Sequence, residues 1–413
     1  MLSNYIKIAI KVLSRRKFYT FVSLFGIAFT LLILNICVAF MDHTFAPMAP
    51  ESRLREILTI EQAVLKGPSW SSSSNPGYGL LDQYARDLPG VKTFAMTSNH
   101  RGVSAFVNGE KVRPELRRTD AAYWEILDFE FVEGAPYNTR DVEQGNFLAV
   151  INEKTRERFF GAPPAVGKTL RVDDQRFTVV GVVKDVPIIR AMAFGEIWVP
   201  LTTAKSTAYK SELIGGMVGI LLAEDRSKFK EIRDELTSRL EAAQLPDPER
   251  YDSLMAGAYT RFEHVARGFF DSDWDDRPVG GMIAVMTLGA LLFMLLPALN
   301  LINLSLSRIL ERASEIGVRK AFGASSITLT GQFLVESIVL TLVGAVIGLV
   351  LSAVALRVLS GVDVIPYADL SLNLRAFLYG LGVALVFAVV SGVYPAWKMS
   401  RLHPVEALHG RSA

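Results

Sequence analysis

The sequence holds few of the residues that usually carry chemistry. It has one cysteine, Cys37, which excludes an intrachain disulfide and a metal cluster held by several thiolates. Cys37 lies within an apolar run, where we expect it to act as a small packing residue. The five histidines are scattered and fit no metal-ligand spacing. We therefore predict no catalytic residue, no metal site and a non-catalytic chain.

The sequence also lacks a nucleotide-binding loop. Gly167-Lys168-Thr169 has the ending of a phosphate-binding loop, but five residues separate Gly161 from Gly167 where the motif has four. Two of the five are prolines, which offer no N–H to a phosphate. The net charge of +2 gives no reason to expect nucleic-acid binding. We expect no cofactor on this chain and no nucleic-acid partner.

Charge is nearly absent from four long apolar runs, at 18–41, 279–307, 327–356 and 376–397. Each is long enough to cross a bilayer as a helix, which takes about 20 residues. We predict a membrane protein with four transmembrane α-helices at 18–41, 278–307, 325–356 and 376–397. A cleaved signal peptide is the alternative for the first run, but its apolar core is too long and no clear cleavage site follows.

Residues 1–17 carry five basic residues and no acidic one, interleaved with apolar residues. This pattern is typical of a basic amphipathic helix that lies on the inner membrane surface, in contact with lipid.

Residues 42–277 differ in kind, because they contain most of the prolines and charges and no run long enough to span. Short β-branched segments alternate with helical ones, which predicts a large α+β domain inserted between the first two spans. The segment 67–79 has the composition of a loop. The predicted strands are 57–61, 91–96, 103–107, 147–151, 177–183, 197–199 and 218–222, and the predicted helices are 79–88, 120–127, 152–160 and 227–243.

A charged stretch, 308–324, connects the second and third apolar runs. Its pattern is helical: Glu315 and Arg319 form a favourable i,i+4 pair, while Glu311 and Glu315 form an unfavourable one. Gly323 is suited to end the helix. From these residues alone the stretch is either a solvated connection or a short helix on which a soluble partner docks.

Three segments carry a resemblance to a known family. The run from Glu311 to Ala324, ERASEIGVRKAFGA, resembles a signature of MacB/FtsX-type ABC transporter permeases. FLAVINEKTRERFFG at 147–161 resembles the MacB extracytoplasmic domain, and YPAWKMSRLHPVEAL from Tyr394 resembles the C-terminal signature of the family. The resemblance implies that 308–324 is a cytoplasmic coupling helix that receives an ATPase subunit. The implied coupling residues are Glu311, Arg312, Glu315, Ile316, Gly317, Arg319, Lys320 and Gly323.

The resemblance also implies partners. Such permeases work as homodimers or heterodimers with two cytoplasmic ATPase subunits, so ATP and magnesium are expected on the partner ATPase. The outer domain is expected to divide into porter and sabre subdomains. An export pump would add a periplasmic adaptor and an outer-membrane duct. The sequence departs from full-length MacB because it shows no fused ATPase domain, which leaves the substrate open.

The distribution of charge predicts the orientation. Residues 1–17, 308–324 and 398–413 together hold 12 Lys or Arg residues and 3 Asp or Glu residues, and so are expected on the cytoplasmic side. Both termini are then inside a bacterial inner membrane. The large domain and the outer connection 357–375 are outside.

A few polar residues fall inside the apolar runs. Asn300 and Asn303 share one face of the second run and are expected to bond neighbouring helices. Glu336 is an intramembrane carboxylate, for which we put a structural role ahead of a proton or substrate role. Gly344 and Gly348 form a small-residue face for close helix packing.

Three functions remain open at this stage. The first is a permease subunit that couples ATP hydrolysis by a separate ATPase to movements of its outer domain, in MacB-like efflux by mechanotransmission. The second is an FtsX-like or lipoprotein-handling permease that regulates or moves a periplasmic protein. The third is a membrane sensor without an ATPase, which the charged connection disfavours.

Overall fold

The computed structural model forms two compact units. The first contains Met1–Asp42, Gly280–Val364 and Asp369–Ala413, and the second contains His43–Val279 and Ile365–Ala368. We call them the helical unit and the outer domain. The described residues are 2–15, 17–161, 164–245, 247, 249–270, 277–311, 318, 322, 325–361, 367 and 372–400.

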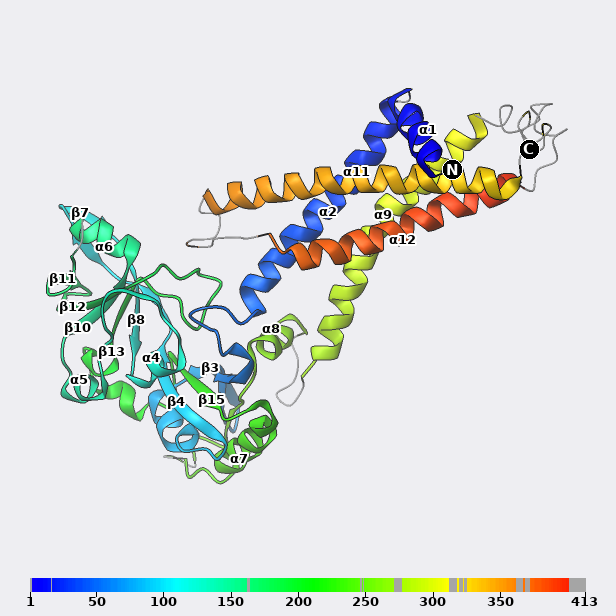
Figure 1. The fold of residues 1–413 in the computed structure, drawn as a ribbon. Helices are drawn as coiled ribbons and strands as arrows, with labels where there is room; N and C mark the ends of the chain where they lie inside the picture. The colour runs from blue at the N-terminus through cyan, green and yellow to red at the C-terminus, as the bar shows by residue number, and fades with distance from the viewer. Residues whose placement is uncertain are drawn as a thin grey trace. The chain divides into compact units, whose positions relative to one another are not determined.

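The helical unit is built from long helices (Figure 1). They are α1 (Leu2–Arg15), α2 (Lys17–Phe45), α9 (Val279–Glu311), α11 (Ser326–Gly361) and α12 (Leu374–Ser400). Within the described residues, two helical segments are long and apolar enough to cross a bilayer, Lys17–Phe45 and Thr330–Gly361. Val279–Leu295 and Leu374–Val390 are shorter apolar segments. All four predicted runs are therefore helical, while the number that cross the membrane stays a prediction.

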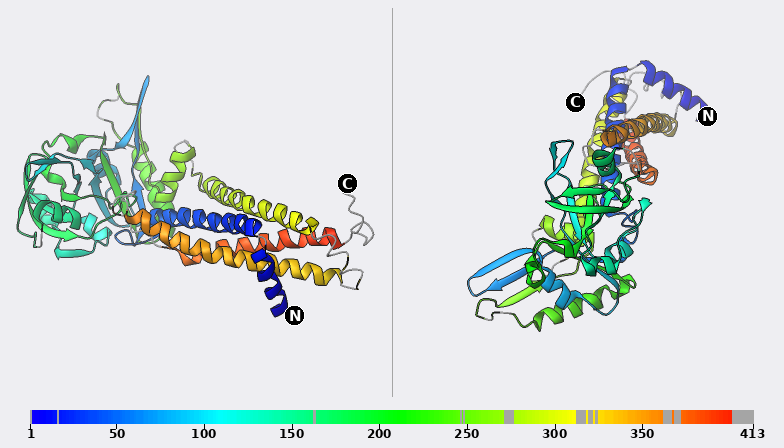
Figure 2. Two further views of the ribbon diagram at one scale, coloured as in Figure 1. Left: turned by 90° about the horizontal axis from the view of Figure 1, so that it is seen from above. Right: turned by 90° about the vertical axis from the view of Figure 1, so that its left-hand side faces the viewer.

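Small residues bring the helices of this unit close together. A Cβ atom added at Gly344 would lie 2.9 Å from Ile27 of α2, and one at Gly348 would lie 3.1 Å from the carbonyl oxygen of Ala28. The predicted glycine face of α11 thus packs directly on α2. Figure 2 shows α11 and α12 side by side from two further directions. Cys37 is exposed on α2, so the expectation that it packs is wrong within this chain.

The outer domain contains a twelve-stranded mixed sheet and a four-stranded sheet. In the large sheet β10 pairs parallel with β12 and β8 parallel with β13, whereas its remaining pairs are antiparallel. Its strands are β1 (Ile57–Ile60), β4 (Val91–Ser98), β5 (Arg101–Gly102), β6 (Ala105–Val107), β7 (Glu110–Val112), β8 (Glu115–Thr119), β9 (Phe131–Gly134), β10 (Leu148–Asn152), β11 (Thr169–Val172), β12 (Gln175–Val183), β13 (Ile197–Pro200) and β15 (Met217–Ala223). The small sheet contains β2 (Ala63–Gly67), β3 (Trp70–Pro76), β14 (Ile214–Gly215) and β16 (Ser253–Ala256).

Short helices lie between these strands, and one more, α8, follows the last of them. They are α3 (Tyr78–Leu80), α4 (Ala122–Ile126), α5 (Thr139–Gln144), α6 (Glu153–Phe160), α7 (Phe229–Glu241) and α8 (Arg261–Phe270). Shorter helical turns are η1 (Leu54–Glu56), η2 (Leu81–Ala85), η3 (Leu201–Thr203), η4 (Ala208–Ser211) and η5 (Arg226–Lys228). The mixture confirms the predicted α+β class.

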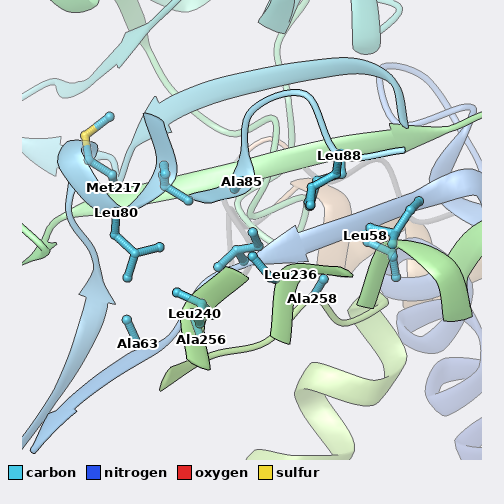
Figure 3. Packing of buried hydrophobic residues seen from close by; sticks show 14 of the residues in the cluster. Leu58, Ala63, Leu80, Ala85, Leu88, Met217, Leu236, Leu240, Ala256 and Ala258 are labelled. Atoms are coloured by element: carbon cyan, nitrogen blue, oxygen red, sulfur yellow. The ribbon is translucent and has the colours of Figure 1, made fainter. Parts of the chain in front are cut away.

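The amphipathic pattern of α7 correctly predicts the side that it buries. Phe229, Ile232, Leu236 and Leu240 are all buried in one hydrophobic cluster. Figure 3 shows Leu236 and Leu240 near Leu80 and Ala256, which come from distant parts of the sequence. Such burial is worth roughly 1.5–3 kcal/mol for each large apolar side chain.

Two predictions made from composition are wrong. The serine-rich segment 67–79 is not a loop, because Ser71–Ser74 pair with β2 in an exposed strand of a hairpin. The predicted helix 79–88 is instead the short α3 followed by one wide turn that ends at Ala85. β8 was not predicted at all, since its Glu115, Arg117 and Arg118 have the appearance of surface residues.

Candidate functional site: the junctions of the outer domain

Most of the predicted coupling residues lie outside the described residues. Glu311 is the last residue of α9. The seven others, Arg312, Glu315, Ile316, Gly317, Arg319, Lys320 and Gly323, fall in segments that the structure does not describe. Asn300 and Asn303 lie on the helical backbone of α9, and their side chains are also outside the description. Docking of an ATPase on 308–324 therefore stays a prediction.

Glu336 is buried among the helices of the helical unit, with 4% of its surface exposed. Leu340 and Gly344 follow it at intervals of four residues, so the three lie along one side of α11. Leu340 is fully buried and Gly344 packs on α2. This side of α11 therefore faces other helices, a position open to either role, and the structural role of Glu336 stays a prediction.

The first junction of the outer domain follows α2 and is built on a buried ion pair. Glu51 and Arg190 are 3% and 2% exposed, and their Oε2 and Nη1 atoms are 3.3 Å apart. The same Nη1 donates to the carbonyl oxygen of Ala46 at 2.8 Å, and the N–H of Ala193 donates to Glu51 at 3.2 Å. Burial raises the pKa of Glu51, and the nearby Arg190 opposes that rise. Loss of one partner would leave the other as an uncompensated buried charge, which costs about 3–5 kcal/mol.

The second junction is α8, which precedes α9 in the chain. Thr260 and Glu263 bond each other's backbone N–H groups at 3.2 Å and 2.7 Å, which forms a capping box at the start of the helix. Glu263 also pairs with Arg233 of α7 at 2.5 Å. Phe262 packs edge-to-face on Phe45, the last residue of α2, with the ring centres 5.2 Å apart. The end of α2 and the start of α8 are thus held together within the outer domain.

The third junction is Tyr367, a residue of the predicted outer connection 357–375. Its hydroxyl donates to the carboxylate of Glu196, and the ammonium of Lys154 lies 4.5 Å from its ring centre. Glu196 also accepts a 2.8 Å bond from the N–H of Glu115 and pairs with Arg158 at 3.6 Å. Burial and the neighbouring Glu196 raise the pKa of Tyr367, so the phenol stays protonated and can donate.

The sequence did not reveal these junctions. Glu51 and Arg190 are 139 residues apart, and each lies in an irregular segment where a charged residue usually faces water. The capping box of α8 is the exception, because Thr260 and Glu263 have its residue types at its spacing.

Among the described residues, each chain connection from the outer domain toward the long helices contains a residue fixed to the domain by polar or ring contacts.

The comparisons with known proteins agree with this two-unit architecture. Residues 20–239 match the family described as the MacB-like periplasmic core domain, and residues 287–404 match the FtsX-like permease C-terminal family. The chain belongs to the MacB/FtsX family of ABC transporter permeases. It is therefore a membrane protein with an extracellular domain. Members of this family are permease components of ABC transporters and are generally non-catalytic, and the family implies an ATPase partner and dimerisation.

Individual relatives are distant. An uncharacterized ABC transporter permease, YknZ of Bacillus subtilis (strain 168), is 24% identical over 347 residues, which cover 81% of each chain. The macrolide export ATP-binding/permease protein MacB of Burkholderia cenocepacia (strain HI2424) is 27% identical over 299 residues, which cover 70% of this chain and 40% of that protein. The solved periplasmic region of MacB from Actinobacillus actinomycetemcomitans matches 53% of this chain and 94% of that chain, with 15% identity and a TM-score of 0.38.

Proposed function

We propose that this permease couples ATP hydrolysis by a separate cytoplasmic ATPase to movements of its outer domain, in MacB-like efflux by mechanotransmission. The observation that carries the proposal is the fixing of the outer domain at its three junctions. A lever requires it, because slack at any junction would absorb the stroke.

We also propose the remaining parts of the assembly, which the family and the distribution of charge support. A second permease subunit completes a homodimer or a heterodimer, and the ATPase with its ATP and magnesium docks on 308–324 in the cytoplasm. Both termini are cytoplasmic and the outer domain is periplasmic, in a bacterial inner membrane. A periplasmic adaptor and an outer-membrane duct would complete an export pump.

An FtsX-like or lipoprotein-handling permease is the alternative. It would use the same ATP-driven movement and differ only in what the outer domain acts on, a periplasmic protein instead of an exported substrate. Stimulation of export by a purified complex, against stimulation of a periplasmic enzyme or release of a lipoprotein, separates the two.

The movement itself is tested with two spin labels on one chain. One is attached to Cys37, which is exposed on α2, and one to a cysteine at Ser73, on the exposed strand β3. The distance between them is measured in the reconstituted complex with and without ATP. We expect an ATP-dependent change in wild type. A complex that binds and hydrolyses ATP without any change in this distance would contradict the proposal.

Junction variants then test what carries the movement. Arg190→Met breaks the first junction, and we expect ATP hydrolysis to continue while the distance change is lost or broadened. Arg156→Met is the matched control, because Arg156 pairs with Glu133 at 3.1 Å inside the domain and lies at none of the junctions. Tyr367→Phe is a milder second variant that removes only the hydroxyl bond to Glu196.

A further inference from the structure

The outer domain contains a cavity of about 300 Å³, beside the segment Arg190–Ala193 of the first junction but lined by none of the residues that form the junction contacts. Its lining residues are Glu61, Asn99, His100, Arg117, Ala191, Met192 and Val218. The volume is at the lower end of the range for small-molecule pockets. Met192 and Val218 are buried and apolar, so part of the lining is hydrophobic.

Arg117 is the unusual member of this lining. Its side chain is 2% exposed, yet none of the described carboxylates lies within ion-pair distance of it. Its guanidinium donates to the carbonyl oxygens of Phe194 at 2.8 Å, Ala191 at 2.7 Å and Ser98 at 3.2 Å. All of these acceptors are neutral. Burial lowers the pKa of Arg117, and the more distant Glu51 and Glu61 oppose this only in part.

A buried charge without a counter-charge is costly, and protein interiors usually pair it. Four neutral oxygen atoms, the three carbonyls and the Thr97 hydroxyl at 3.4 Å, accept from Arg117, which has five N–H groups, and none of them cancels its charge. An anion in the adjacent cavity would do so, in surroundings where water screens the interaction poorly. The planar guanidinium is the side chain best suited to bind a carboxylate.

The acidic residue of the cavity sets a limit on that anion. Glu61 already lies 3.3 Å from His264 and 3.8 Å from Arg261, and it accepts a 2.8 Å bond from Thr59. It therefore does not need a cation from a ligand. Its own charge would repel a ligand with two negative charges, so a monoanion fits better than a phosphate dianion.

We propose that this cavity binds a small monocarboxylate that carries a short apolar group, with the carboxylate on Arg117 and the apolar group against Met192 and Val218. The ligand would be of about the size of an N-acylated apolar amino acid. The proposal concerns binding by the outer domain alone and does not depend on ATP coupling or on what the complex exports.

The test is equilibrium dialysis of the full chain in a non-ionic detergent with N-acetyl-leucine as the probe. N-Acetyl-leucinamide is the matched neutral probe, which has the same apolar group without the charge. We expect saturable binding of the acid and roughly tenfold or more weaker binding of the amide, because hydrogen bonds to charged groups are worth that factor. Equal binding of the two probes, or no saturable binding of the acid, overturns the proposal.

Variants locate the site. Arg117→Met should abolish the preference for the acid, while Arg118→Met should keep it, because Arg118 is the neighbouring buried arginine of β8 and pairs instead with Asp173 at 3.3 Å. Ala191→Phe fills the cavity and leaves the backbone carbonyl that Arg117 uses. If Arg117→Met does not fold, binding of the acid to Ala191→Phe tests the location of the site instead. Undiminished binding of the acid to Ala191→Phe overturns the proposal, and so does a preference for the acid that survives in folded Arg117→Met.

Discussion

Asp120 is a buried carboxyl whose ionisation the fold alters strongly. It precedes α4 and accepts backbone N–H bonds from Met96 at 2.7 Å and Tyr123 at 3.0 Å. Burial raises its pKa from 3.8 to about 7, although the two N–H bonds act in the opposite direction. The folded chain therefore holds a proton on Asp120 at pH values where the unfolded chain has lost it.

This shift predicts how the stability of the outer domain depends on pH. The pKa of Asp120 is higher in the folded chain than in the unfolded chain, so its contribution to the free energy of unfolding is fully present below about pH 4. That contribution is lost as the pH rises to about 7, at roughly 1 kcal/mol per pH unit. Asp120→Asn should flatten this part of the profile. Thermal unfolding of both proteins between pH 4 and 8 measures the difference, and identical slopes would contradict the assigned pKa.

At the level of elements, the packing of α11 on α2 gives a prediction with an internal control. Gly344→Leu places a side chain where even a Cβ atom would lie 2.9 Å from Ile27, so the two helices must separate. Overpacking of this kind typically costs 1–3 kcal/mol. Gly331→Leu, on the same helix, meets open space within 4 Å and should be tolerated. The measurement is the thermal stability of the two variants in detergent. Equal stability would show that the contact between Gly344 and Ile27 contributes little to the stability of the protein.

The charged connection 308–324 gives a second prediction at this level. Exchanging the charges by Glu315→Arg with Arg319→Glu keeps the i,i+4 pair, at a cost of only tenths of a kcal/mol. The pattern presented to an ATPase is reversed, and unfavourable charge contacts at an interface can cost several kcal/mol. The variant should insert normally and lose its ATPase, as measured by co-purification. A normal yield of ATPase with normal coupled activity would favour the solvated connection.

The sequence correctly predicts which side of a helix is buried where the pattern of one helical face is enough, as in α7 and the glycine face of α11. It does not predict elements whose burial depends on contacts with residues far along the chain. β8 was missed because Arg117 and Arg118 are buried by partners far along the chain, and β3 because its serines pair with β2. The junctions were missed for the same reason: Arg190 and Tyr367 meet their carboxylates only in the folded domain. The predicted coupling residues depend on the family resemblance and, beyond Glu311, lie outside the described residues.

For the whole molecule, the distribution of charge predicts which parts can be reached from each side of the membrane. In a Cys37→Ala background, single cysteines at Ser73 and at the exposed Glu110 should react with a membrane-impermeant maleimide added outside the inner membrane. A cysteine at Ser314 should react only after the membrane is opened. Reaction of Ser314 from outside would reverse the orientation.

The two ends of the outer domain are joined to each other. The backbone N–H groups of Thr59 and Tyr259 donate to each other's carbonyl oxygens at 2.8 Å and 2.9 Å, and Phe45 packs on Phe262, each nearer to its end of the domain. A domain whose first and last segments are paired places its chain ends together, as domains that tolerate insertion into other proteins do. Evolution could therefore replace the outer domain by another domain whose chain ends are also paired, because α2 and α9 would still be joined through adjacent chain ends. The choice of substrate or partner could in this way change without altering the ATP-driven movement that we propose for the helices.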